Sequence, residues 1–104
     1  MRYLGGISGS AVLKCNGEEI APASYDFDVF FETSAGVTGC GEIRLAVTAL
    51  KGVFGRKEVQ LLTGDGRLLD LRFSEKELLP ASDVAHVDVT GDLPAAPQNW
   101  RRPR

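Results

Sequence analysis

The chain has 104 residues, of which 43% are hydrophobic and 25% charged, and its formal net charge is −2. This length allows one hydrophobic core but not two, and the composition is that of an ordinary folded protein. Three of the twelve basic residues lie in the last four positions, so residues 1–100 carry nine basic and fourteen acidic groups. A body with this excess of acid is a poor binder of polyanions, so we expect no nucleic acid partner.

The sequence also indicates the cellular compartment and the redox state of the cysteines. No apolar run approaches the length of a membrane span, and the first six residues lack the apolar region of a signal peptide. We therefore expect a cytoplasmic protein with no membrane partner. Cys15 and Cys40 are the only cysteines and lack metal-ligand spacing, so we expect two free thiols, with a disulfide as the alternative.

The first half of the chain contains a predicted hairpin and two longer strands. Asn16-Gly17 is a strong signal for a two-residue turn. Pairing about this turn sets Leu13 opposite Ile20 and Lys14 opposite Glu19. The strand that follows alternates between an inward and an outward set, which are Tyr25, Phe27, Val29 and Phe31, and Asp26, Asp28, Phe30 and Glu32.

A glycine-rich stretch at residues 34–41 is predicted to be a flexible connection. After it, apolar residues again recur at every second position, which predicts a further half-buried strand. Its inward residues are Ile43, Leu45, Val47 and Ala49.

The clearest structural signal is a hairpin over Glu58–Phe73, with a loop at Gly64-Asp65-Gly66. A two-residue loop would set apolar residues beside charged ones. A three-residue loop instead pairs Leu61 with Leu69 on one face and Gln60 with Asp70 on the other. Because a slip of one residue turns every side chain to the opposite face, the pattern favours the three-residue loop.

The last part of the chain predicts one more strand. Ser74 followed by Glu77 resembles a helix cap, and Pro80 stops any long helix, so we expect at most one short helical turn near residues 75–79. Val84–Thr90 alternates as a strand. We predict a single all-β domain over residues 1–93 and a Pro/Arg-rich tail over 94–104.

Together these elements predict an all-β fold of about six to seven short strands. Short links between consecutive strands favour meander-like connections. The fold is either an antiparallel β-sandwich or a small β-barrel, because both give the same local signals.

The chain shows little catalytic chemistry. His86 is the only histidine, and Asp88 could orient it, but an exposed strand histidine beside an aspartate is the more common case. Asp26 and Asp28 share one strand face, where solvated carboxylates are more common than an acid–base pair. These four are the weak polar candidates. We predict no catalytic residue, metal ligand or cofactor.

One surface suggests an interface. In the favoured register Leu62 faces Leu68 on the outer face of the hairpin, and Phe30 is an outward apolar residue on the long strand. A contiguous exposed apolar patch is typical of an interface. A second subunit, the Leu78-Leu79 segment or the tail around Trp100 could cover it.

The function predicted from these features is a non-enzymatic binding or assembly module that self-associates through this apolar sheet face. Two alternatives stay open. The first is a small barrel that holds an apolar ligand among its aromatic residues, Tyr25, Phe27, Phe31 and Phe73. The second is an enzyme that uses Asp26, Asp28 or His86 at a subunit interface.

Overall fold

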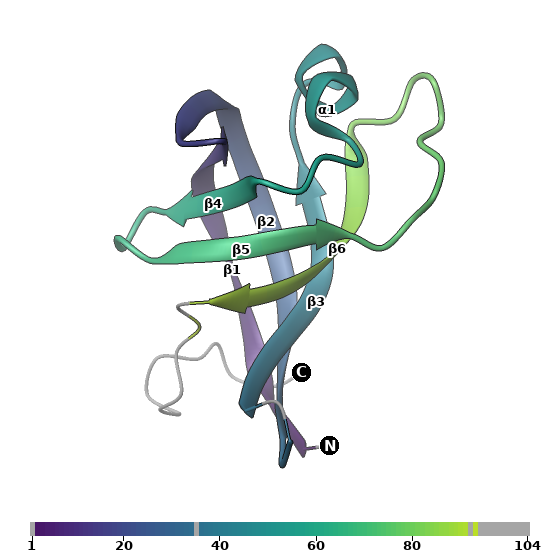
Figure 1. The fold of residues 1–104 in the computed structure, drawn as a ribbon. Coiled ribbons are helices and arrows are strands. Elements are labelled where there is room, and N and C mark those ends of the chain that lie inside the picture. Colours follow the sequence, from purple (N-terminus) through teal and green to yellow (C-terminus); the bar gives the residue numbers. More distant parts are fainter. Residues whose placement is uncertain (1, 35, 92, 94–104) are drawn as a thin grey trace.

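The computed structural model describes residues 2–34, 36–91 and 93. These residues form a closed antiparallel barrel of six strands and one short helix (Figure 1). The elements in chain order are β1 (Arg2–Cys15), β2 (Glu18–Glu32), β3 (Gly36–Arg44), α1 (Val47–Val53), β4 (Val59–Thr63), β5 (Leu68–Phe73) and β6 (Val84–Gly91). The predicted all-β fold is confirmed, and of the two predicted architectures the barrel is the one that forms.

The barrel consists of two meanders of three strands each. The strand order around it is β1-β2-β3-β6-β5-β4, so consecutive strands are neighbours within each half. The two halves join where β3 pairs with β6 and β1 pairs with β4. The connection from β3 to β4 carries α1, which lies at one end of the barrel (Figure 1). The predicted meander connections are therefore found within each half, whereas the link from β3 to β4 joins two strands that are not neighbours.

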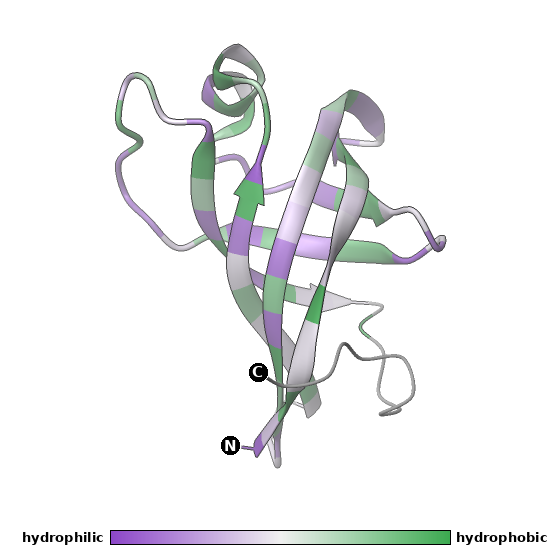
Figure 2. Ribbon diagram, turned by 180° about the vertical axis from the view of Figure 1, so that it is seen from behind, coloured by the Kyte–Doolittle hydropathy of each residue, from purple (hydrophilic) through white to green (hydrophobic). Residues whose placement is uncertain are grey.

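The inward positions of all six strands, together with α1, fill the barrel. Along the strands apolar and polar residues alternate, as the coloured ribbon of Figure 2 shows. The largest fully buried side chains are Phe27, Leu13, Ile43, Leu50, Leu61, Leu69, Val29, Val59, Val87 and Val89. Leu50 comes from α1, so the helix closes one end of the core.

The β4–β5 hairpin has the predicted three-residue loop. Leu61 pairs with Leu69, and both are fully buried. On the outer face the side-chain amide of Gln60 donates a hydrogen bond of 2.9 Å to the Asp70 carboxylate. Gly66 has a φ of 88°, the left-handed conformation that glycine adopts at the end of such a loop.

The β1–β2 hairpin follows the prediction only next to its turn. Asn16 and Gly17 both have positive φ, and Lys14 pairs with Glu19 as expected. The predicted pairing of Leu13 with Ile20 is wrong, because a bulge inserts one extra residue and Leu13 pairs with Ala21 instead. Ile20 is consequently 39% exposed.

Two segments have a different structure from the one predicted. The glycine-rich stretch is not a loop, because residues 36–44 form β3. The strand expected to continue to Ala49 ends at Arg44, and Val47–Val53 is helical. Residues 75–79 form no helix, so the short helical turn lies earlier in the chain than expected.

Phe31 was expected in the core but is 46% exposed. It pairs with Arg2 and Val37, beyond the last described pair of β3 with β6 at Gly39. At this end β2 continues past the closed part of the barrel, so an inward position no longer faces a filled interior. The predicted tail, residues 94–104, lies outside the described residues, and the domain division stays a prediction.

Candidate functional site

The first candidate site is an apolar row on the outer face of four neighbouring strands. Val12 pairs with Pro22 on one side and with Leu62 on the other, and Leu62 pairs with Leu68. Because paired residues share a face, these four side chains form one row about 15 Å long, which we call the apolar band. Leu68 is 39% exposed, and Ile20 adds an equally exposed side chain from the bulge on β2.

Polar side chains border the apolar band. The next row along the strands contains the Lys14–Glu19 and Gln60–Asp70 pairs. The other border is the tip of the β4–β5 hairpin, where the Gly64 amide donates a hydrogen bond to the Ser10 carbonyl. An apolar centre with a polar rim is the usual anatomy of a protein interface.

Phe30 does not belong to this band. It pairs with Tyr3 near the far end of β2, and the two rings lie 5.5 Å apart. The Leu78-Leu79 segment does not cover the band either, since Leu78 packs against the core and Leu79 is 76% exposed. Trp100, the remaining predicted interface residue, lies outside the described part of the chain.

The four polar candidates all lie on the outer face of the β2-β3-β6 sheet, in two rows. One row contains Asp28, Cys40 and Asp88, and the next contains Asp26, Glu42 and His86. Adjacent strands lie about 4.8 Å apart, so the β2 and β6 residues of a row are roughly twice that distance from one another. Within the described residues no group of three potential ligands could hold a metal ion.

The local environment of His86 is structural in character. Its Nδ1 lies 3.1 Å from the Ser74 hydroxyl, which donates a hydrogen bond of 3.0 Å to the His86 carbonyl. The His86 amide in turn donates to the Glu75 carboxylate at 2.8 Å. The Ser74 hydroxyl thus lies within hydrogen-bond distance of both the ring and the backbone carbonyl of His86. Through these contacts Ser74 and Glu75 attach the loop after β5 to the neighbouring strand β6.

Cys40 and Cys15 are both free thiols, as predicted. Burial raises the pKa of the Cys40 thiol, and the negative charges of Asp28 and Asp88 on the flanking strands raise it further. A thiol held in its neutral form is a poor nucleophile and a poor metal ligand. Burial and, after it, the two neighbouring carboxylates therefore favour the neutral form of this thiol.

A second candidate site was not found from the sequence. It is a groove of about 610 Å³ between the end of α1 and the end of β5. Its walls contain two aromatic rings and four cationic side chains, which are Phe54, Phe73, Arg56, Lys57, Arg72 and Lys76. We call this set the basic groove. The sequence signal that could have revealed it is the repeated proximity of phenylalanine and basic residues, in residues 54–57 and again in 72–76.

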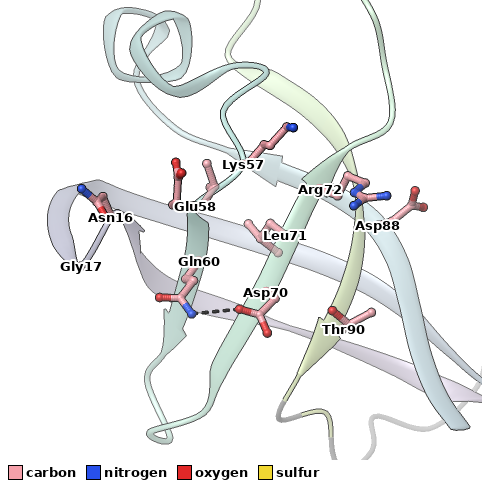
Figure 3. A pocket seen from close by; sticks show the side chains of 11 residues that line it. Asn16, Gly17, Lys57, Glu58, Gln60, Asp70, Leu71, Arg72, Asp88 and Thr90 are labelled. Atoms are coloured by element: carbon pink, nitrogen blue, oxygen red, sulfur yellow. Dashed lines mark hydrogen bonds between the residues drawn. The ribbon is translucent and has the colours of Figure 1, made fainter. Parts of the chain in front are cut away.

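The basic groove continues into a second hollow on the outer face of β4, β5 and β6, drawn in Figure 3. Lys57, Leu71 and Arg72 line both. The hollow has a volume of about 680 Å³, and three carboxylates line it, those of Glu58, Asp70 and Asp88. The sign of the local charge thus changes from positive to negative between the two depressions.

The aromatic residues expected to surround an apolar ligand do not share a space. Phe27 is fully buried and stacks near Tyr25, with ring centroids 5.1 Å apart. Phe31 is exposed at the far end of β2, and Phe73 packs against Phe54 beside the basic groove. The four aromatic residues therefore lie in three different places of the fold.

The fold and these surfaces define a small six-stranded barrel with an apolar band and a basic groove on its outside. Models of known families, curated proteins and solved structures contain no match to this chain. Among the described residues, no helix is long and apolar enough to cross a membrane.

Proposed function

We propose that this protein is a non-enzymatic assembly module that associates with a second copy of itself through the apolar band. The observation that carries the proposal is the register that aligns Pro22, Val12, Leu62 and Leu68 on four neighbouring strands. The row is continuous and contains no charged side chain.

A second copy suits this surface because it offers the same row in return. In a twofold interface each patch packs against its own counterpart, so an apolar row bordered by polar residues meets an apolar row with the same border. A standard interface buries about 800 Å² on each partner. Its apolar centre provides most of the affinity, and its rim excludes water from that centre. The Gln60–Asp70 and Lys14–Glu19 pairs would form part of that rim.

The arrangement of the polar candidates supports binding over catalysis. The two candidates on β2 are separated from the two on β6 by the whole width of β3. The cytoplasmic location expected from the sequence remains part of this proposal.

Light scattering on Leu68→Glu tests the proposal. A charge placed in the apolar centre of a dimer would have to be buried without a partner, so we expect the dimer to weaken about tenfold or more. Leu79→Glu is the matched control, because it makes the same change at a leucine that is 76% exposed and outside the band. A wild-type protein that stays monomeric at high concentration, or a Leu68→Glu dimer as tight as the wild type, would contradict self-association.

A further inference from the structure

We propose that the basic groove binds a small, multiply charged anion that carries a flat ring, with nucleoside phosphates as the representative class. This site is separate from the apolar band, because Leu68 and Arg72 lie toward opposite ends of β5. The two proposals therefore stand or fall independently.

The groove concentrates positive charge in a molecule whose body is acidic. Four of the nine basic residues in positions 1–100 line it, and all four are exposed. The ion pairs of the described residues engage Arg44 and Arg67, and none of these four cations. Arg72 lies opposite Asp88 on the neighbouring strand without an ion pair between them (Figure 3).

The one carboxylate in the groove is already engaged. Glu75 accepts a hydrogen bond of 2.8 Å from the His86 backbone amide, which directs its charge toward β6. The four cations against this one carboxylate, +4 and −1, leave a local charge of +3 for a ligand. Phosphate groups are the anions that several lysine and arginine side chains bind together, since each phosphate offers several acceptor oxygens.

The two phenylalanines define the other part of the ligand. The rings of Phe54 and Phe73 lie 5.0 Å apart at an angle of 50°, and both are only partly buried. Partly exposed aromatic rings beside cations are the combination that stacks a base while the cations neutralise its phosphate. Gly55, with a φ of 81°, turns the chain between Phe54 and Arg56.

The neighbouring hollow limits the size of the ligand. The groove has a volume of about 610 Å³, within the range of small-molecule sites. A longer polyanion that continued across β5 would meet Glu58, Asp70 and Asp88 in the adjoining hollow. Like charges at this position repel it, so the groove favours a small phosphate ester over a nucleic acid strand.

Isothermal titration calorimetry with three probes tests this proposal. Adenosine triphosphate carries both the anion and the ring, tripolyphosphate only the anion, and adenosine only the ring. We expect adenosine triphosphate to bind roughly tenfold tighter than tripolyphosphate, the contribution of one stacked base. Its affinity should fall as sodium chloride is raised, because added salt screens exposed charges.

Two double variants test whether adenosine triphosphate binds in the basic groove. Lys57→Gln combined with Lys76→Gln removes one cation from each wall, and we expect adenosine triphosphate affinity to fall about fivefold, the combined contribution of two exposed ion pairs of ordinary strength. Lys14→Gln combined with Lys51→Gln removes the same charge outside the groove and should leave affinity unchanged. Equal losses in both double variants would overturn the proposal, as would the absence of binding to the wild type.

Phe54→Leu separates the ring from the charges. We expect this variant to bind tripolyphosphate as the wild type does, which also shows that it is folded, but to lose the preference for adenosine triphosphate. If the wild type binds tripolyphosphate and adenosine triphosphate equally well, the ring has no role and the proposed ligand class is wrong.

Discussion

Gly41 on β3 lies directly opposite Phe27 on β2, and the absence of a side chain at Gly41 leaves room for the Phe27 ring in the core. A Cβ atom at position 41 would lie 2.1 Å from the Asp26 carbonyl oxygen and 2.9 Å from the Phe27 Cα. Both contacts are with backbone, which cannot move without separating β2 from β3. We therefore expect Gly41→Ala to lower the free energy of unfolding by about 3 kcal/mol, measured by urea denaturation.

Gly52→Ala is the matched control, because we expect it to raise the free energy of unfolding instead of lowering it. Gly52 lies within α1, and a Cβ there would meet no atom within 4 Å. Alanine is the better helix former, so we expect a gain in stability of about 0.5–1 kcal/mol. If both substitutions changed the free energy of unfolding equally, the β2 backbone would not limit the size of the side chain at position 41.

The alternation along β4 gives a second prediction. Leu61 is fully buried, whereas Leu62 points outward and is only half-buried. We expect Leu61→Ala to lower the free energy of unfolding by about 2–5 kcal/mol, because it leaves a cavity in the core. Leu62→Ala should cost less than about 1 kcal/mol in the monomer. A larger loss at Leu62 in thermal or chemical unfolding would contradict the register of the hairpin.

The loop of the same hairpin gives a prediction on pH. The Thr63 hydroxyl donates a hydrogen bond to the Asp65 carboxylate, and it is the largest of the effects that lower the pKa of Asp65 below its ordinary value of 3.8. A carboxyl whose pKa is lowered by folding stabilises the fold above its ordinary pKa. That contribution is lost as the pH falls through the lowered pKa.

Thr63→Val keeps the branched shape of this buried residue and removes the hydroxyl. We expect the pKa of Asp65 to rise toward 3.8, as followed by NMR titration of its carboxyl carbon. The variant should be less stable than the wild type at neutral pH, with the Asp65 part of this difference fading in acid. An unchanged Asp65 titration would exclude Thr63 as the main cause.

Cys40 provides a prediction on reactivity. Because the charges of Asp28 and Asp88 contribute to its raised pKa, replacing either with asparagine should lower that pKa and increase the thiolate fraction. We expect faster alkylation of Cys40 by iodoacetamide in Asp28→Asn and Asp88→Asn, located by mass spectrometry. Glu19→Gln, a charge removed elsewhere, should leave the rate unchanged, and so rule out an effect of net charge.

The sequence predicted a strand pairing correctly where the apolar pairs on one face and the polar pairs on the other favour the same register. In the β4–β5 hairpin a single register puts Leu61 with Leu69 and Gln60 with Asp70, so alternation was sufficient. In the β1–β2 hairpin the turn was equally clear, but a bulge adds a residue at Ile20 without a signal of its own. Alternation cannot locate a bulge when both nearby registers leave an apolar residue opposite Leu13.

Tertiary packing accounts for the other differences. Val47 and Ala49 continue an alternating pattern, but Leu50 and Val53 also have helical spacing, and covering the end of the barrel selects the helix. The glycines of β3 are typical of a loop. The role of Gly41 becomes visible only in the fold, where it lies opposite Phe27. The basic groove could not be predicted for the same reason, because Phe54 and Phe73 are distant in sequence and come together only in the folded barrel.

The division of the barrel into two meanders has a consequence for how the chain folds. Within each half every strand pairs with its neighbour in sequence, so residues 2–44 and 59–91 can each form a three-stranded unit from contacts that are closer in sequence than those that close the barrel. Closure of the barrel through the β1–β4 and β3–β6 pairs joins residues that are distant along the chain. Because loop entropy opposes such contacts, we expect the slow step of folding to be the docking of two preformed halves.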